Sequence, residues 1–203
     1  MKAFVTCGPA SEPIDAVRVI TNRSTGELGA LLAEALAAAQ ISVDCFRGAG
    51  ATHPAPAGVA VRTFETNADL WALLDGAGES PDVIFHAAAL CDFGGSGTGK
   101  IESRSDELVL RLSPLPKLLP KFRQRFPQAR IVGWKFEVEG TGGDARANAE
   151  RQLRECDSDL CVLNGPAIGA GFEVFSRDRG FIQAVRTKEK LGDFLRDWAL
   201  SPG

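Results

Sequence analysis

Polar side chains crowd the stretch DAVRVITNRSTGELG near the N-terminus, between an apolar segment and an alanine-rich one. Ser24, Thr25 and Gly26 stand where the alanine-rich segment begins a helix, so free backbone N–H groups and the positive end of the helix dipole are available to an anion. One of the two hydroxyls would be enough to cap the helix. Arg18 and Asn22 supply donors for which a cap has no use, and we therefore expect this junction to bind a polar, anionic ligand.

Apolar segments with strand-like and helix-like spacing alternate along most of the chain. The segment FEVFSRDRGFIQAV at 172–185 has two apolar runs around turn residues and predicts a hairpin. This order predicts one α/β domain over residues 1–203, a Rossmann-like, doubly wound and mostly parallel sheet with a C-terminal β-hairpin. Strands are predicted at 2–6, 41–46, 59–64, 83–89, 108–112, 129–136 and 160–163, and helices at 26–39, 66–74, 116–126, 144–156 and 188–198.

Ligands of such sheets bind at the carboxyl ends of the strands, where the strand order reverses. The segments of interest are therefore those that follow predicted strands, at residues 7–25, 88–100, 133–137 and 164–169. The first of them is long for a connection between a strand and a helix, which favours a functional role for it.

Composition excludes several classes of protein. The formal net charge of −3 gives no basic surface for nucleic acid, and no stretch approaches the ~20 apolar residues of a membrane span. The first residues, MKAFVTCG, form too short an apolar run for a secretion signal, so we expect a cytoplasmic protein. Five cysteines contain no CxxC pair, and with two histidines we expect no dedicated metal site and treat His53 and His86 as structural.

The first loop resembles that of a known family. Residues 8–29 match almost throughout a string, Gly-x-x-x-Glu-Pro-(Leu/Ile)-Asp-x-Val-Arg-x-Ile-(Ser/Thr)-Asn-x-Ser-(Ser/Thr)-Gly-x-(Met/Leu)-Gly, that is typical of phosphopantothenoylcysteine synthetases, also called phosphopantothenate–cysteine ligases. Further segments are similar to motifs of this family in the same order, so the resemblance covers most of the chain. They are HAAALCDF at 86–93, GKIES at 99–103, SPLPKLL at 113–119, VGWKFE at 132–137 and LCVLNG at 160–165.

The resemblance implies a ligation in two steps within coenzyme A biosynthesis. The carboxylate of 4'-phosphopantothenate attacks the α-phosphate of CTP or ATP, and the amine of cysteine then attacks the resulting acyl-nucleotidylate. Cations and oriented N–H donors supply most of the catalysis of such a step, by positioning and by charge stabilisation. Mg²⁺ is expected to bridge phosphate oxygens and to be held mainly by the substrate.

The same resemblance assigns roles to individual residues. Asn22 is expected to contact the acyl carbonyl of the intermediate, Arg18 to support that site, and Lys100 to contact the triphosphate. Asn164 is expected to contact the substrate. The nucleotide-binding residues implied are Gly8, Ser24, Thr25, Gly26, Ala88, Asp92, Phe93, Lys100 and Trp134.

Several of these residues also have ordinary structural interpretations. Lys100 could also be a solvated loop residue and Asp92 a helix cap, although we favour nucleotide contacts for both, while Trp134 could equally serve packing and Asn164 a turn. The family motif carries lysines where this chain has Glu102 and Ser103, which predicts weaker binding of a triphosphate, although Lys135 could restore one cation. A noncatalytic nucleotide-binding homologue is therefore an open alternative.

A nicotinamide-dependent Rossmann oxidoreductase is the alternative from another enzyme class. It predicts GxGxxG after the first strand and, in its short-chain subclass, a Tyr-x-x-x-Lys pair. The loop lacks the glycine pattern and the chain contains no tyrosine, so we place this alternative last.

The resemblance also implies partners. The active sites of the family are completed across a two-fold interface, which predicts a homodimer whose contact is the 172–185 hairpin or the segment after Lys100. Because the chain begins at the ligase domain, we expect the flavin-dependent decarboxylase of the pathway to be a separate protein.

Overall fold

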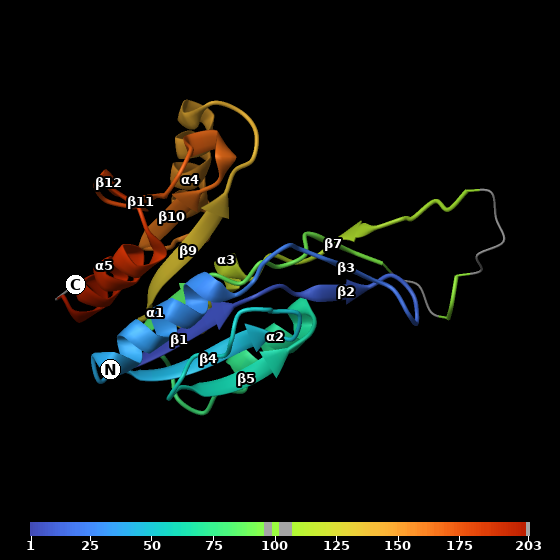
Figure 1. Ribbon diagram of the computed structural model, residues 1–203, viewed down its shortest axis with the longest axis horizontal. Helices are drawn as coiled ribbons and strands as arrows, with labels where there is room; N and C mark the ends of the chain where they lie inside the picture. The colour runs from blue at the N-terminus through green and yellow to red at the C-terminus, as the bar shows by residue number, and fades with distance from the viewer. Residues whose placement is uncertain (96–98, 102–106, 202–203) are drawn as a thin grey trace.

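One eight-stranded sheet collects strands from both ends of the chain, in the order β12-β11-β10-β9-β6-β1-β4-β5. The computed structural model describes residues 1–95, 99–101 and 107–201 (Figure 1). Strands β5 to β10 in this order run parallel, while β11 and β12 form an antiparallel hairpin at one edge. The strands are β1 (Lys2–Cys7), β4 (Ser42–Gly48), β5 (Ala60–Phe64), β6 (Val83–His86), β9 (Arg130–Phe136), β10 (Leu160–Asn164), β11 (Phe172–Ser176) and β12 (Gly180–Val185).

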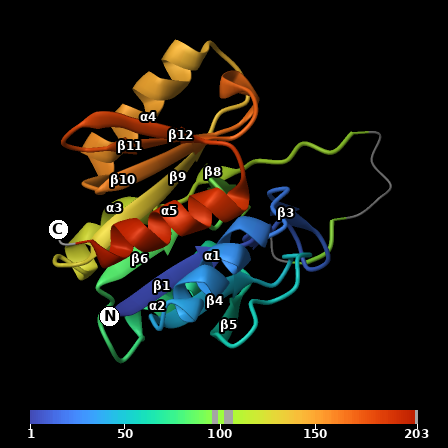
Figure 2. The same ribbon diagram turned by 60° about the vertical axis from the view of Figure 1, so that its left-hand side comes forward.

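Helices cover both faces of this sheet (Figure 2). Helices α1 and α5 pack against each other and on one face, while α2, α3 and α4 lie on the other. The helices are α1 (Glu27–Ala38), α2 (Asn67–Asp75), α3 (Leu119–Arg125), α4 (Gly142–Cys156) and α5 (Lys188–Leu200), with a short 3₁₀ turn η1 (Pro166–Ile168). The predicted doubly wound, mostly parallel sheet with a C-terminal hairpin is therefore confirmed.

Successive side chains of the central strands are buried on alternate faces of the sheet. In β1, Val5 belongs to the cluster under α1 and α5, and its neighbour Phe4 belongs to the cluster under α2 and α3. Both are fully buried, as expected for a parallel strand covered by helices on each face. Within the described ranges, no helix is long and apolar enough to cross a bilayer.

The strand order reverses at β1, which pairs with β4 on one side and with β6 on the other. The loops after β1 and β6 continue this pairing beyond the sheet, because Ala89 donates its N–H to Gly8 O at 2.9 Å and Ala10 donates to Ala89 O at 3.0 Å. The crevice in which such folds bind ligands therefore lies between these two loops.

Two small hairpins project from this edge of the sheet as an arm (Figure 1). Strands β2 (Ser11–Pro13) and β3 (Val19–Thr21) form one of them, inside the long first loop, and β7 (Phe93–Gly94) and β8 (Ser113–Pro114) form the other. The first hairpin was not predicted, because its strands are three residues long and carry no apolar alternation.

Two predicted elements are wrong in detail. Residues 108–112 are not a strand, because pairing with β7 begins only at Ser113. Helix α3 begins at Leu119 and not at Pro116, since the Leu115 N–H still bonds to Asp92 O at 2.8 Å and keeps the backbone beside the second hairpin. Apolar residues therefore lie along 108–110 for a reason other than the sheet.

Candidate active site

Glycines let three loops meet at the start of α1. Gly8 and Gly26 both have φ of +79°, and Gly26 occupies the N-cap position without a side-chain cap. A Cβ on Gly8 would lie 2.8 Å from the Ala51 side chain, and one on Gly26 would lie 3.0 Å from the same atom. The Thr25 hydroxyl accepts the Glu27 N–H at 3.3 Å. The sequence therefore uses glycine here to bring backbone, not side chains, to the helix terminus.

Asn22 joins the first loop to the loop after β6. Its amide nitrogen donates to Leu90 O at 2.8 Å and to Ala89 O at 3.3 Å. The Thr21 hydroxyl, one residue earlier, donates to Ala10 O at 2.7 Å. These bonds fix Asn22 in the crevice between β1 and β6, where the resemblance expects the acyl group of the substrate.

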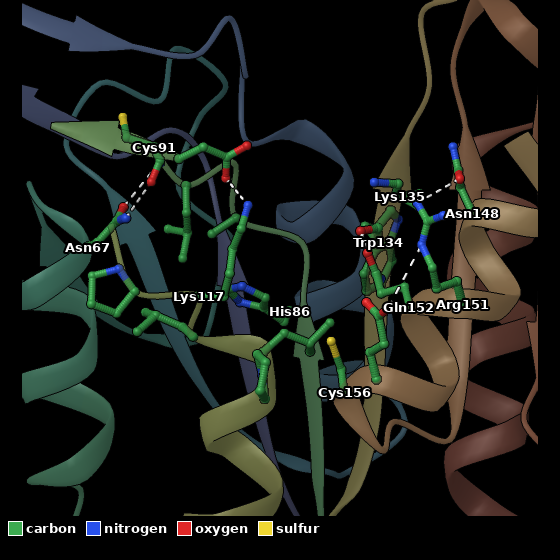
Figure 3. A pocket seen from close by; sticks show the side chains of 18 residues that line it. Asn67, His86, Cys91, Lys117, Trp134, Lys135, Asn148, Arg151, Gln152 and Cys156 are labelled. Atoms are coloured by element: carbon green, nitrogen blue, oxygen red, sulfur yellow. Dashed lines mark hydrogen bonds and ion pairs between the residues drawn. The ribbon is translucent and has the colours of Figure 1, made fainter. Parts of the chain in front are cut away.

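Next to this crevice a cavity of about 350 Å³ opens between α3 and α4. Three predicted nucleotide-binding residues, Ala88, Asp92 and Trp134, line it. Figure 3 shows Asn67, Cys91 and Lys117 on one wall and Trp134, Lys135, Asn148, Arg151 and Gln152 on the other, with His86 and Cys156 near the base. The structure thus brings residues from five segments of the sequence around one space.

The charged lining of the cavity has three cations, Lys117, Lys135 and Arg151, and two carboxylates, Asp92 and Glu155. Lys117 pairs with Asp92, Lys135 lies 3.4 Å from the Glu137 carboxylate, and Arg151 donates to Asn148 Oδ1 at 2.8 Å. The Lys117–Asp92 pair is exposed, so it is easily exchanged for contacts with a ligand. The cavity therefore fits an anionic ligand with an apolar part.

His86 forms part of the floor and is neutral. Its Nδ1 lies 2.8 Å from the Thr6 hydroxyl, and that hydroxyl accepts the Ala88 N–H at 3.2 Å. Burial lowers the pKa of His86 to about 4. Thr6 and His86 thus fix the backbone at Ala88, a predicted nucleotide contact.

Trp134 has a polar atom that no described residue satisfies. Its indole Nε1 is buried and has no hydrogen-bond partner in the described part of the chain. A buried N–H without a partner is energetically unfavourable, and such a donor normally binds an acceptor from water or from a ligand. The Trp134 ring packs against the core cluster under α1 and α5, and this packing leaves its indole N–H without a partner among the described residues.

Arg18 and Lys100 lie on the arm. Arg18 pairs with Asp15 and donates to Ile101 O at 3.4 Å, so it contacts a neighbour of Lys100. Lys100 itself is exposed. Glu102 and Ser103, which stand in place of the family's lysines, fall outside the described residues.

The other predicted nucleotide- and substrate-binding residues do not line the cavity: Gly8, Ser24, Thr25 and Gly26 lie at the start of α1, and Phe93 and Asn164 lie elsewhere. Phe93 is half exposed in β7. Asn164 ends β10 opposite Phe136 and does not line the cavity; its carbonyl accepts the Glu137 N–H at 2.9 Å. No contact in the described ranges connects Asn164 to the cavity, and its predicted contact with substrate stays a prediction.

Most of the cavity's polar lining was not among the predicted site residues. Asn148, Arg151, Gln152 and Glu155 were detectable in principle, because their spacing of three and four residues puts them on one face of a helix. That stripe is also what any solvated helix face looks like. Only the packing of α4 beside α3 turns the stripe into a cavity wall.

The fold and the site together define a Rossmann-like α/β protein whose ligand-binding crevice lies where the strand order reverses. Residues 1–193 match the family model described as the DNA/pantothenate metabolism flavoprotein C-terminal domain. The chain therefore belongs to this family, the phosphopantothenoylcysteine synthetase family that the motifs resemble.

Relatives and solved structures agree with this assignment. The chain is 32% identical over 199 residues to the coenzyme A biosynthesis bifunctional protein CoaBC of Mycobacterium bovis, covering 94% of this chain and 48% of that protein. It is 30% identical over 209 residues to the CoaBC of Thermococcus kodakarensis, with 97% and 50% covered. The chain thus spans about half the length of the curated relatives it matches. The DNA/pantothenate metabolism flavoprotein from Streptococcus pneumoniae superposes with a TM-score of 0.86 at 26% identity, covering 98% of this chain and 97% of that one.

Proposed function

We propose that this protein is a phosphopantothenate–cysteine ligase that uses CTP or ATP. The observation that carries the proposal is the juxtaposition at the carboxyl ends of β1 and β6. There Asn22 is bonded to the loop that leads, through Ala88 and Asp92, into the cation-lined cavity. An acyl group at Asn22 and a nucleotide in the cavity would be neighbours, as an acyl-nucleotidylate requires.

The reaction we propose has two balanced steps. A carboxylate oxygen of 4'-phosphopantothenate forms a bond to the α-phosphorus, and the bond from that phosphorus to the oxygen bridging to the β-phosphate breaks, releasing pyrophosphate. The cysteine nitrogen then forms a bond to the acyl carbon, the bond from that carbon to the phosphate oxygen breaks, and the amine loses a proton. The second step releases the nucleoside monophosphate.

The cavity supplies the charge that the first step needs. Lys117, Lys135 and Arg151 line it, and we propose that they help Lys100 to bind the phosphates. The resemblance alone would leave the site short of cations where Glu102 and Ser103 stand. Cations contributed by α4, by β9 and by the segment before α3 answer the main argument for a noncatalytic homologue, which is the loss of the family's lysines at positions 102 and 103.

Magnesium is proposed as a companion of the triphosphate. Among the described residues, no group of three or more His, Cys, Asp or Glu side chains could hold a metal ion. Asp92 places one exposed carboxylate at the cavity, which fits the habit of Mg²⁺ of binding one or two carboxylates together with substrate phosphates. When bound, the ion would neutralise phosphate charge.

We also propose a homodimer formed through the arm. Val17 and Val109 are 64% and 67% exposed, and Val19, Leu108 and Leu110 are exposed beside them in sequence. Clustered exposed apolar side chains are typical of protein interfaces. A second copy covering the arm would shield the acyl-nucleotidylate from water. A flavin-dependent decarboxylase is proposed to act on the product.

Pyrophosphate release tests the proposed function. The protein is incubated with 4'-phosphopantothenate, cysteine and either CTP or ATP, and pyrophosphate is measured. We expect release with at least one nucleotide, and we expect Lys100→Gln to reduce it at least ~10²-fold while Lys190→Gln, on the exposed face of α5, leaves it unchanged.

Each negative result has a distinct meaning. If the unmodified protein releases no pyrophosphate but binds CTP or ATP, it is the noncatalytic homologue. If Lys100→Gln and Lys190→Gln behave alike, Lys100 is a solvated lysine and the triphosphate site is assigned wrongly.

A further inference from the structure

The segment that carries Lys100 is attached to the turn of the first hairpin. Ala16 donates its N–H to Gly99 O at 2.8 Å, and Ile101 donates its N–H to Asp15 Oδ2 at 3.0 Å. The residues on both sides of Lys100 are therefore bonded to the turn, although more than eighty positions separate them from it in the sequence.

Asp15 is the centre of this attachment. Its side chain is 1% exposed and also accepts the N–H groups of Arg18 and Val17, at 2.7 and 2.9 Å. The Arg18 guanidinium pairs with the same carboxylate and reaches Ile101 O. These bonds hold the pKa of Asp15 at about 2, the Ile101 N–H being the largest cause.

The other end of the same hairpin leads to Asn22. Strand β3 runs from Val19 to Thr21, and the Thr21 and Asn22 side chains bond to the loops after β1 and β6. The hairpin thus connects the crevice that holds Asn22 to the segment that holds Lys100.

From this we infer that Asp15 is a positioning residue, which fixes Lys100 relative to Asn22 so that one reactant can meet both. The inference rests on the proposed function for the role of Lys100, but the attachment itself does not depend on it. Misplacement of a catalytic group by about 1 Å can cost 10²-fold in rate.

An amide cannot replace this carboxylate. Asp15 faces N–H donors on every side, and an asparagine would present its own N–H groups to some of them. Asp15→Asn should therefore release Ile101 while changing the side-chain volume little.

Two measurements report the attachment without any assay of activity. Limited trypsin digestion followed by mass spectrometry gives the rate of cleavage at the Lys100–Ile101 bond, which should rise at least ~10-fold in Asp15→Asn. The control is Asp159→Asn, because Asp159 likewise accepts a backbone N–H, from Ile131 at 2.7 Å, and pairs with Arg123 at 2.8 Å, far from Lys100 in the fold. Equal cleavage rates in the unmodified protein and in Asp15→Asn would overturn the inference.

Amide exchange covers the case in which Asp15→Asn does not fold. In the unmodified protein, NMR should find the Ile101 and Ala16 amides protected from exchange relative to residues 107–110, which are exposed. Unprotected amides at both positions would overturn the attachment directly.

A double-mutant cycle separates positioning from simple stability. We expect Asp15→Asn to lower kcat for pyrophosphate release ~10–100-fold, and to have almost no further effect in a Lys100→Gln background, since it acts through that lysine. Effects that multiply in the double variant would reduce Asp15 to a structural residue. Absence of pyrophosphate from the unmodified protein would refute the proposed function, and the cleavage and exchange rates would still decide the attachment.

Discussion

Stability of this protein should depend on pH through one buried histidine. His86 is 8% exposed, ends β6, and contacts the Thr6 hydroxyl and the edge of the Phe122 ring. Its pKa falls from 6.5 to about 4 because burial disfavours the imidazolium. Below pH 6.5 the unfolded chain binds a proton at His86, whereas the folded chain binds it only near pH 4. The free energy of unfolding therefore decreases as the pH falls through this window.

The magnitude follows from the two pKa values of His86. A fall of the pKa from 6.5 to about 4 corresponds to about 3 kcal/mol of unfolding free energy once the pH is below 4. Between pH 7.5 and pH 5 the loss should be about 2 kcal/mol, and above pH 7 it should vanish. For a domain whose whole stability is about 5–15 kcal/mol, this is easily measured.

The assay compares urea unfolding of the unmodified protein and of His86→Asn at pH 7.5 and pH 5. Asparagine keeps an acceptor for the Thr6 hydroxyl but cannot be protonated in this range. The variant loses stability at both pH values because it packs less well, and that loss cancels in the comparison. We expect the unmodified protein to lose about 2 kcal/mol more than the variant between the two pH values.

Equal pH dependence of the two proteins would refute this reasoning. It would mean that His86 is protonated in the folded state at pH 5, and hence that the base of the cavity is wetter or more flexible than its burial indicates. His86→Gln, which extends its amide along the ring direction, provides a second comparison if the asparagine variant is too unstable at pH 5.

Asn22→Asp removes the donor to Leu90 O and puts a carboxylate beside the acyl carbonyl, so acyl-nucleotidylate should accumulate and be detected by mass spectrometry; equal slowing of both steps would contradict this role. Gly48→Ala places a Cβ against the Pro9 carbonyl oxygen and should lower the unfolding free energy by about 1–3 kcal/mol, whereas Gly78→Ala, which meets nothing within 4 Å, should leave it nearly unchanged. Val17→Glu on the arm should convert a dimer to a monomer in sedimentation at micromolar concentration, and a monomeric unmodified protein would contradict the dimer.

The central sheet could be predicted because its signals are local. Apolar runs such as VIFH need cover on both faces, and the alternation of such runs with helical spacing permits few architectures. The glycines after the first strand and the stretch from Arg18 to Gly26 could also be identified, because a motif of fixed spacing is recognised without knowing its spatial neighbours. The family and the location of the crevice followed from these features.

The short hairpins could not be predicted in the same way. Strands β2, β3, β7 and β8 are two or three residues long, and they exist because of contacts with each other and with the loops after β1 and β6. The apolar residues at 108–110 resembled a strand because an apolar run indicates burial. The sequence does not show whether such a run is buried in a sheet or against a partner.

By itself, therefore, the sequence determined the doubly wound fold and the residues that the family motif shares, because periodicity and spacing are properties of the chain alone. Only the tertiary structure decided which cations line the cavity and what holds Lys100. Lys117, Lys135 and Arg151 become neighbours when α3 and α4 pack on the same face of the sheet. Asp15 meets Ile101 across 86 positions of sequence, where no local pattern can record that a carboxylate and a backbone N–H will share one buried site.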